Sequence, residues 1–364
     1  MGFAFIKHDT NIDFVGMRRW AYVLSVLAIL VGFASLWMSG GPRYGIDFAG
    51  GAIVQVHFDR DVEDEAIKKS LAATDLPGVS VQRFGEGARD YMIRVSHSEA
   101  TSEQLRVMVT KGLTDALKDT KFTIERLEMV GPKVGADLRS KAIEAMYYAV
   151  LLIAVYISGR FEQRWMAAAI MSGALWGGMY LLEIMGLGKE WMVFGALILT
   201  VVLCWKLKLN FALGAIVGLM HDVLISIGLL SLLGKEFDLN IIAALLTLVG
   251  YSLNDTIIVY DRIRETLRAR PDDNFANIIN RSINQTLSRT ILTSGTTLVV
   301  TLALFLLGGG VIHDFALTML IGIFIGTLSS IFVSSPVLLA FGDPQQYALG
   351  EEEAYEKPGE HGVV

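Results

Sequence analysis

The sequence predicts a polytopic α-helical membrane protein of about eight spans that carries one small α+β domain outside the bilayer. Three observations support this fold class. Hydrophobic residues make up 53% of the 364 residues, and the mean hydropathy is +0.49. Several stretches of about 18 to 22 residues are nearly free of charge, and helices of this length cross a bilayer core of about 30 Å. One polar region, at about residues 39–137, interrupts these stretches.

Eight apolar segments are predicted to span the membrane. They are residues 19–38, 139–158, 165–187, 191–206, 210–233, 240–260, 291–308 and 315–341. The residues before them, 1–18, do not start a cleavable signal, because the apolar run that follows is too long and lacks a small-residue cleavage site. The chain is therefore expected to keep its first span.

Positive charges at the ends of these segments predict their orientation. With eight spans, the ends rich in Lys and Arg all fall on one side, whereas the opposite loops "GLGKE", "GKEFD" and "GGGVIHD" carry few positive charges. Short loops rich in Lys and Arg stay in the cytoplasm. Both termini are therefore predicted to be cytoplasmic. Residues 342–364 form an acidic, apolar-poor tail that is predicted to be disordered.

The polar region, residues 39–137, is predicted to form strand, helix, strand, strand, helix and strand on the far side of the membrane. "GAIVQVHF" alternates in hydropathy, "VEDEAIKKSLAAT" is amphipathic, and "TSEQLRVMVTKGLTDALK" opens with residues that commonly start a helix. This order of elements is typical of a ferredoxin-like α+β unit. The sequence therefore predicts one such domain between the first two spans, with the transmembrane bundle in residues 138–341.

No catalytic or metal-binding constellation is evident in the sequence. Asp47, His57 and Asp59 are spaced along the first strand region, but His57 has no partner set that would make a metal site and is interpreted as an ordinary strand histidine. The one cysteine, Cys204, forms neither an internal disulfide nor a metal cluster. Walker, GxGxxG and HExxH motifs are lacking as well. The prediction is a protein without enzymatic activity, without a cofactor and without a nucleic-acid partner.

Asp255 is the first candidate functional residue because it lies inside the sixth predicted span. It is about five residues, or ~7.5 Å of helix rise, from the cytoplasmic end. A carboxylate at this depth costs a few kcal/mol unless it is paired or solvated. Successive members of the set Thr247, Tyr251 and either Asn254 or Asp255 fall at helical spacings of three and four, which predicts a broad polar face. Such a face indicates either a path for protons or ions, which we favour, or a cluster of hydrogen bonds that packs helices.

Arg289 is the candidate partner of Asp255, since it lies at the cytoplasmic mouth of the seventh span. The two side chains can meet if the sixth and seventh spans are neighbours, as a hairpin connection favours. A nearby guanidinium stabilises the charged carboxylate, whereas burial destabilises it. A carboxylate that alternates between two such environments can load a proton in one conformation and release it in the other.

Other polar residues within or beside the spans are weaker candidates. His221 and Asp222 lie near the middle of the fifth span, where they could give proton access, orient Asp255 or pack helices. Adjacent helix positions point about 100° apart, so the two side chains are not expected to face one spot. Asp261 and Arg262 mark the membrane exit of the sixth span and are interpreted mainly as a solvated helix end.

Five segments resemble, in the same order, the SecF family of bacterial protein-translocase subunits. They are "YGIDFAGG" (44–51), "ALGAIVGLMHDV" (212–223), "EFDLNIIAALLTLVGYSLNDTIIVYDRIRE" (236–265), "RSINQTLSRTILTS" (281–294) and "DFALTMLIGIFIGTLSSIFVSSPVLL" (314–339). The resemblance implies a complex of the RND superfamily type, in which SecF works with SecD at the SecYEG channel, where SecA drives export by ATP hydrolysis. It further implies that the complex uses the proton-motive force to complete translocation of unfolded preproteins across the bacterial inner membrane.

The resemblance also implies which residues move the proton. Asp255 and Arg289 match the Asp and the Arg that the family uses, and a further Asp of the path lies on SecD. The supporting polar residues would be Tyr251, Asn254, His221, Asp222, Asp261 and Arg262. Sodium stays open as the coupling ion, because a carboxylate beside Asn and Thr oxygens suits either cation.

One segment departs from the family pattern. The usual SecF has six spans, whereas residues 165–208 look like an extra membrane hairpin, which would leave the orientation of the later spans unchanged. Two other functions stay open at this point. One is a subunit of an RND-type exporter of small molecules or lipids, although such exporters commonly carry larger external loops. The other is a structural assembly factor in which Asp255 only packs helices.

Overall fold

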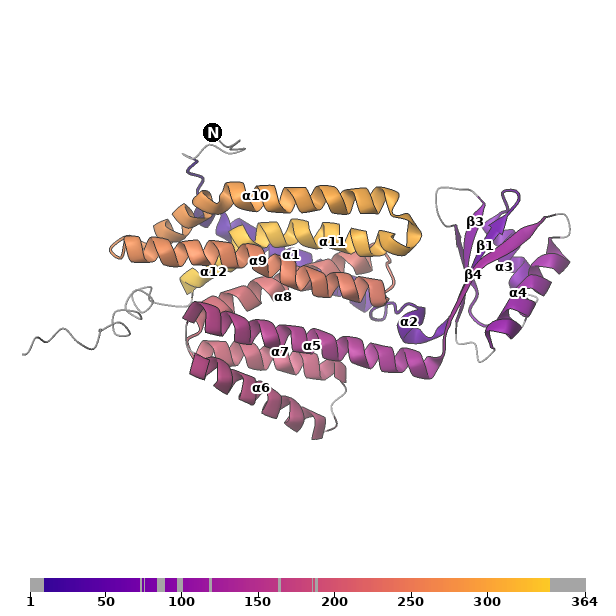
Figure 1. Ribbon diagram of the computed structural model, residues 1–364, viewed down its shortest axis with the longest axis horizontal. Coiled ribbons are helices and arrows are strands. Elements are labelled where there is room, and N and C mark those ends of the chain that lie inside the picture. The colour runs from indigo at the N-terminus through magenta and orange to yellow at the C-terminus, as the bar shows by residue number, and fades with distance from the viewer. Residues whose placement is uncertain are drawn as a thin grey trace, which may run out of the picture.

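The computed structural model describes residues 10–340, except 73, 75, 84–88, 97–100, 118–119, 163–164, 185 and 187–188. The predicted acidic tail therefore lies outside the described residues. A bundle of long helices occupies one end of an elongated molecule, and a small domain with a β-sheet occupies the other (Figure 1). The apolar spans and the polar region of the sequence thus form separate parts of the molecule.

Long helices build the bundle. They are α1 (Phe14–Met38), α5 (Pro132–Glu162), α6 (Trp165–Ile184), α7 (Lys189–Lys206), α8 (Asn210–Leu232), α9 (Leu239–Ala269), α10 (Phe275–Leu307) and α11 (Gly309–Ser329). After α11 the chain continues as a π-helical turn (Ser330–Ser334), α12 (Ser335–Val337) and a 3₁₀ turn (Leu338–Ala340). Among the described residues, six helical stretches are long and apolar enough to cross a membrane, namely Phe14–Met38, Pro132–Arg160, Asn210–Leu232, Leu239–Ala269, Phe275–Leu307 and Ile312–Ala340. The chain is therefore a multi-pass membrane protein.

The predicted extra hairpin is helical. Helices α6 and α7 pack against each other and against α5, on the side of the bundle away from α10 (Figure 1). The apolar stretch Gly195–Lys206 of α7 is shorter than a membrane span. The total of about eight spans therefore stays a prediction, and the hairpin lies far from the helices that carry Asp255 and Arg289.

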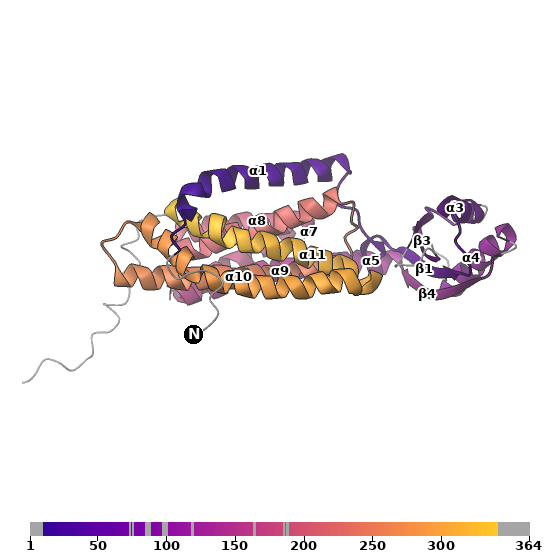
Figure 2. The ribbon, with the colours of Figure 1, turned by 90° about the horizontal axis from the view of Figure 1, so that it is seen from above.

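Helix α8 is buried along much of its length, whereas α1 runs along the edge of the bundle (Figure 2). The two helices meet at glycines, since a Cβ on Gly228 would lie 2.7 Å from the Cα of Gly32. Small residues allow this close approach of two backbones, which strengthens van der Waals packing where lipid surrounds the helices. Much of the remaining surface of α1 consists of exposed apolar side chains, including Trp20, Leu24 and Leu27, as expected of a lipid-facing helix.

The sheet domain contains strands and helices in the order predicted from the sequence. They are β1 (Gly51–Phe58), α3 (Asp64–Ala72), β2 (Ser80–Arg83), β3 (Asp90–Ser96), α4 (Ser102–Ala116) and β4 (Phe122–Val130), preceded by a single turn, α2 (Ile46–Ala49). The strands lie in the order β2-β3-β1-β4, and neighbours are antiparallel. Alternate strand residues such as Val54 and Ile93 pack against apolar residues of the covering helices, such as Leu105 of α4, and form the core. The opposite face of the sheet is open.

Candidate functional site

Asp255 is buried between α9 and α10, with only 2% of its surface exposed. Its Oδ2 accepts a hydrogen bond of 2.9 Å from the Oγ of Ser294 on α10. Within the described residues this is the one side-chain hydrogen bond that the carboxylate accepts. A buried carboxylate usually needs several donors or a cation, so Asp255 is poorly satisfied as an anion. Asp255 is thus a buried carboxylate with few hydrogen-bond donors in the part of the chain that the structure describes.

Arg289 lies near Asp255 but makes no ion pair with it in the described part of the chain. Its side chain is exposed on α10, and its positive charge acts on the Asp255 carboxylate from a distance. The two residues thus lie on neighbouring helices, as the hairpin connection favoured. Direct contact between them would require α9 and α10 to shift, or the guanidinium to swing inward.

The polar face predicted on α9 is divided. Asp255 points inward, whereas Thr247 and Asn254 are exposed. Between them, the Tyr251 hydroxyl donates a hydrogen bond of 3.2 Å to Thr297 Oγ1 of α10. The prediction that these α9 residues share one face is therefore wrong for Asp255, because adjacent helix positions diverge by about 100°.

A polar strip remains on the outside of the bundle across α9 and α10. Thr293 and Thr297 follow Arg289 at one-turn intervals, so they line the same side of α10. Thr297 contacts Tyr251, which lies one turn from the exposed Asn254 on α9. These five residues form what we call the polar strip. Exposed polar groups within membrane-spanning helices are costly in lipid, so this surface suits a protein neighbour.

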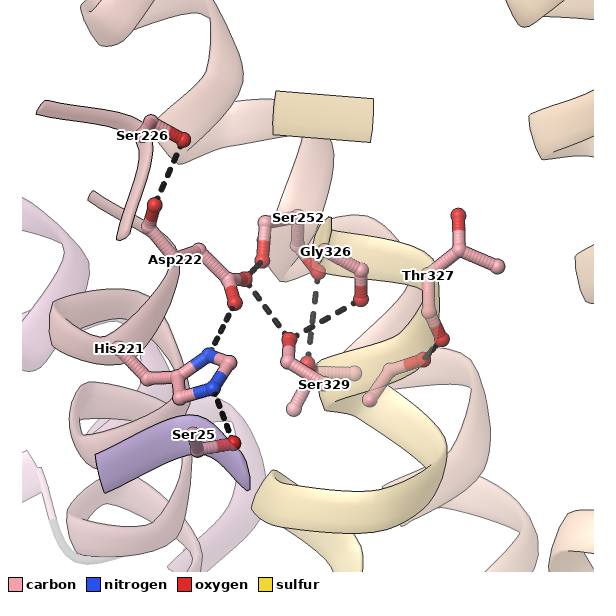
Figure 3. A network of polar contacts seen from close by, with 10 residues as sticks. Ser25, His221, Asp222, Ser226, Ser252, Gly326, Thr327 and Ser329 are labelled. Atoms are coloured by element: carbon pink, nitrogen blue, oxygen red, sulfur yellow. Dashed lines mark hydrogen bonds and ion pairs between the residues drawn. The ribbon is translucent and has the colours of Figure 1, made fainter. Parts of the chain in front are cut away.

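His221 and Asp222 form a second buried site (Figure 3). The Asp222 side chain is fully buried, and its Oδ1 lies 2.8 Å from His221 Nδ1. Its Oδ2 accepts hydrogen bonds from Ser329 Oγ on α11, at 2.8 Å, and from Ser252 Oγ on α9. The other ring nitrogen, His221 Nε2, lies 2.8 Å from Ser25 Oγ on α1. We call these five residues the Asp222 network.

The Asp222 network corrects one prediction. Adjacent positions were not expected to face one spot, yet the imidazole of His221 turns back to the carboxylate of the next residue. The network also stays separate from Asp255 within the described residues, although Ser252 and Asp255 lie one turn apart on α9. Sequence reasoning missed the serines that complete it. Serines at helix interfaces in apolar spans were the available signal, because hydroxyls there hydrogen-bond across helices.

Asp261 and Arg262 lie where α9 leaves the apolar part of the bundle. Arg160 of α5 donates a hydrogen bond of 2.9 Å to Asp261 Oδ2. Arg262 donates to Gln285 Oε1 of α10 at 2.7 Å and to Glu265 at 2.5 Å. Both Asp261 and Arg160 are largely exposed, and exposed ion pairs contribute little stability. These contacts agree with the interpretation of a solvated helix end.

At its other end, α9 is joined to the chain that leads into the sheet domain. Asp47 Oδ2 accepts a hydrogen bond of 3.0 Å from the backbone N–H of Leu239, the first residue of α9. Phe237 exchanges backbone hydrogen bonds with Arg43 and Gly45, at 2.7 and 2.9 Å. Asp238 caps the same helix by accepting from Ile241 N. The first turn of α9 is thus hydrogen-bonded to the chain segment that contains "GIDFAGG".

Charged residues surround this junction. Arg94 of β3 pairs with Glu236 in the turn before α9, and Lys235 Nζ lies 2.6 Å from Asp314 Oδ1 of α11. Burial raises the pKa of the Asp238 carboxyl, and the negative charges of Asp47 and Asp314 add to the rise. A cavity of about 530 Å³ separates the open sheet face from this end of the bundle. The sheet domain therefore contacts the bundle through a charged interface that encloses a cavity.

Comparisons with known proteins give matches over nearly the whole chain. The family model "Protein export membrane protein SecD/SecF, C-terminal" matches residues 110–187 and 187–343, and the "SecD/SecF GG Motif" model matches residues 36–62. The break between the two parts of the first match falls at residue 187, inside the predicted hairpin. The chain is 40% identical over 353 residues to Protein translocase subunit SecF of Magnetococcus marinus, with 96% of this chain and 98% of the relative covered. It is 35% identical over 351 residues to the subunit of the same name from Vibrio alginolyticus, with 95% of both covered.

Solved structures agree with these relatives. The crystal structure of SecDF, described as a translocon-associated membrane protein from Thermus thermophilus, matches with a TM-score of 0.67 at 32% identity and covers 92% of this chain. A second SecDF structure, in a super-membrane-facing form, matches with a TM-score of 0.54 and covers 96% of this chain. The chain spans about two fifths of the length of these SecDF chains, 39% and 40% respectively.

Proposed function

Since the chain belongs to the SecF family of protein translocase subunits, we propose that it couples a flow of protons to Sec-dependent protein export. The chain is a transport component of the Sec pathway, as its relatives are. In the proposed cycle, Asp255 takes up a proton in one conformation of a complex with SecD and releases it in another. The observation that carries the proposal is the burial of this carboxylate with a single hydroxyl donor.

The energy available to such a cycle is adequate for mechanical work. Moving one charge across the membrane is worth about 2.3 kcal/mol per 100 mV. Neutralising Asp255 removes the electrostatic reason for Arg289 to stay near it. Protonation would therefore release Arg289, and deprotonation would draw it inward, so the distance between α9 and α10 would follow the state of the carboxyl.

The SecD partner is proposed to cover the polar strip. In this chain alone, Arg289 and Asn254 are exposed at the surface of spanning helices, where lipid would leave them unsatisfied. A carboxylate on a partner helix would satisfy the guanidinium and supply the further Asp of the path. The part of the SecDF chains that this chain does not cover is consistent with a second subunit of this kind.

The placement of the parts in the cell follows from the same proposal. The sheet domain, with its ferredoxin-like order of elements, would lie in the periplasm, both termini in the cytoplasm, and the bundle in the bacterial inner membrane. Helices α6 and α7 would add two spans, giving about eight. SecYEG, acting with SecA, would hand the emerging unfolded preprotein to the complex, and the sheet domain would bind it weakly.

An isosteric substitution tests the proposal. Asp255→Asn keeps the volume and the hydrogen bond from Ser294 but does not titrate. We expect inverted membrane vesicles that contain this variant and SecD to lose the gradient-dependent part of export of a secreted reporter. Asp272→Asn, an exposed carboxylate in the turn between α9 and α10, is the control and should keep it.

Both variants must be present at equal membrane levels and must retain SecD. Full gradient dependence in Asp255→Asn would contradict the proposal and favour the packing role of an assembly factor. Replacing the proton gradient with a sodium gradient shows which of the two ions drives export. Export that responds only to sodium would keep Asp255 as the site and change the ion.

A further inference from the structure

Three side chains capable of binding a metal ion meet on the open face of the sheet. They are His57 of β1, Asp90 of β3 and Glu125 of β4, and one potential ligand atom from each lies within 4.8 Å of the others. No partner of His57 was predicted from the sequence, because the two acidic residues come from other strands. Their convergence therefore corrects the interpretation of His57 as an isolated strand histidine.

The histidine and the aspartate are held together by the register of the sheet. His57 pairs directly with Asp90 across the antiparallel β1–β3 ladder. Directly opposed side chains on one face lie about 4.5–5.5 Å apart at Cβ. The imidazole Nδ1 lies 2.5 Å from Asp90 Oδ1, so the two side chains are in hydrogen-bond contact.

Glu125 lies at a β-bulge in β4. Ile124 pairs with Val56, and Arg126 pairs with the preceding residue of β1, Gln55. Glu125 is therefore the extra residue, opposed by no residue of its own. A bulge interrupts the alternation of side chains along a strand, here between Glu125 and Arg126. Thr123 pairs directly with His57, so ordinary alternation places Glu125, two residues later, on the same face as the histidine.

The three side chains provide one more ligand than a simple ion pair requires. Two ligand atoms about 2.1 Å from a tetrahedral Zn²⁺ are about 3.4 Å apart, so His57 Nδ1 and Asp90 Oδ1, which lie 2.5 Å apart, would separate to admit the ion. A simple pair between His57 and Asp90 does not require a second carboxylate close by, and two carboxylates near each other repel unless a cation lies between them. The side chains of His57 and Asp90 are 42% and 32% exposed, so an ion can enter from solvent.

We propose that His57, Asp90 and Glu125 bind a divalent transition-metal ion of the zinc class. One imidazole nitrogen and two carboxylates suit Zn²⁺, Co²⁺ or Ni²⁺, whereas Mg²⁺ and Ca²⁺ prefer oxygen ligands alone. The ion would take the place of the hydrogen bond between His57 and Asp90, and water would complete the coordination. The ion would join β3, β1 and β4 and stiffen the open face of the domain that we propose to meet exported chains.

The test uses the full-length protein, purified in detergent with an affinity tag that contains no histidine and stripped of metal with EDTA. Titration with Co²⁺ should give visible absorption bands at one ion per chain, and Zn²⁺ should displace it. His57→Gln and Glu125→Gln should each weaken Zn²⁺ binding at least about tenfold, since even outer-shell substitutions commonly cost 10–100-fold. Glu128→Gln, on the same strand, is the matched control and should bind normally.

Amide hydrogen exchange distinguishes a lost metal site from a variant that folds poorly. Zn²⁺ should slow amide hydrogen exchange in β4 of the wild type and of Glu128→Gln, but not of Glu125→Gln, whose exposed side chain is not needed for the core. The proposal is overturned if Zn²⁺ does not bind the wild type. It is also overturned if binding survives in either His57→Gln or Glu125→Gln, because the three ligands would then not form one site.

Discussion

Two buried carboxylates, Asp222 and Asp255, have unequal surroundings. Asp222 faces a histidine and two serine hydroxyls, which together satisfy both of its oxygens. Asp255 has one hydroxyl donor within the described residues. Because a buried polar group is costly where its hydrogen bonds are missing, Asp222 is suited to hold helices together, whereas Asp255 is the residue for which we propose a change of protonation.

We expect Asp222→Ala to destabilise the bundle. The change would leave His221, Ser252 and Ser329 without their shared acceptor, at about 1–3 kcal/mol for each buried group left unsatisfied. Thermal unfolding of the purified protein in detergent measures the loss. Ser226→Ala is the control, because its hydroxyl bonds only to the backbone oxygen of Asp222. A melting temperature equal to that of the control would contradict a structural role.

The Asp238 carboxyl predicts a dependence of stability on pH. Its pKa is raised in the folded protein by burial, so just above the ordinary value of 3.8 the folded state binds more protons than the unfolded state. Stability contributed by this group should therefore rise as the pH falls through that window. Asp238→Asn keeps a good helix cap and should remove this contribution, as thermal unfolding of both proteins between pH 4 and 7 would reveal. Identical pH profiles would show that another group is responsible.

At the scale of elements, hydropathy predicted the apolar helices well and their polar extensions poorly. The predicted span 291–308 is the apolar end of α10, which begins at Phe275. Its polar half continues the helix because Asn274 caps the first turn and α9 packs beside it, neither of which a hydropathy window detects. The bulge at Glu125 and the serines of the Asp222 network depend likewise on neighbours distant in sequence. Local patterns cannot specify such contacts.

The start of α9 also depends on a contact with a residue distant in the sequence. Asp47, from a segment far earlier in the chain, accepts from the first N–H of this helix. Asp47→Ala should cost about 0.5–2 kcal/mol, the usual range for a lost cap. We expect amide hydrogen exchange in the first turn of α9 to be faster in Asp47→Ala than in the wild type. Asp59→Ala is the control. Unchanged exchange would indicate that Asp238 caps the helix alone.

At the scale of the whole molecule, the sheet domain rests on the end of the bundle from which α9 starts. If export requires the domain to move, fixing it there should stop the gradient-dependent step. We expect a reducible bis-maleimide linker between cysteines at Arg94 and Glu236, in a Cys204→Ala background, to block export and reduction to restore it. Normal export by the fully cross-linked protein would exclude such motion. Either cysteine alone is the control.

The glycine contact between α1 and α8 has a consequence for how the protein is made. Ser35 of α1 also meets Ser231 of α8, a partner 196 residues later in the chain. At a synthesis rate of about 5–20 residues per second, α1 waits about 10–40 s before α8 leaves the ribosome. Its apolar outer surface lets α1 remain alone in lipid during this interval. Its small residues then form the contact with α8 once that helix has been inserted. Assembly of the bundle is therefore an association of an early helix with a late one, within a single polypeptide.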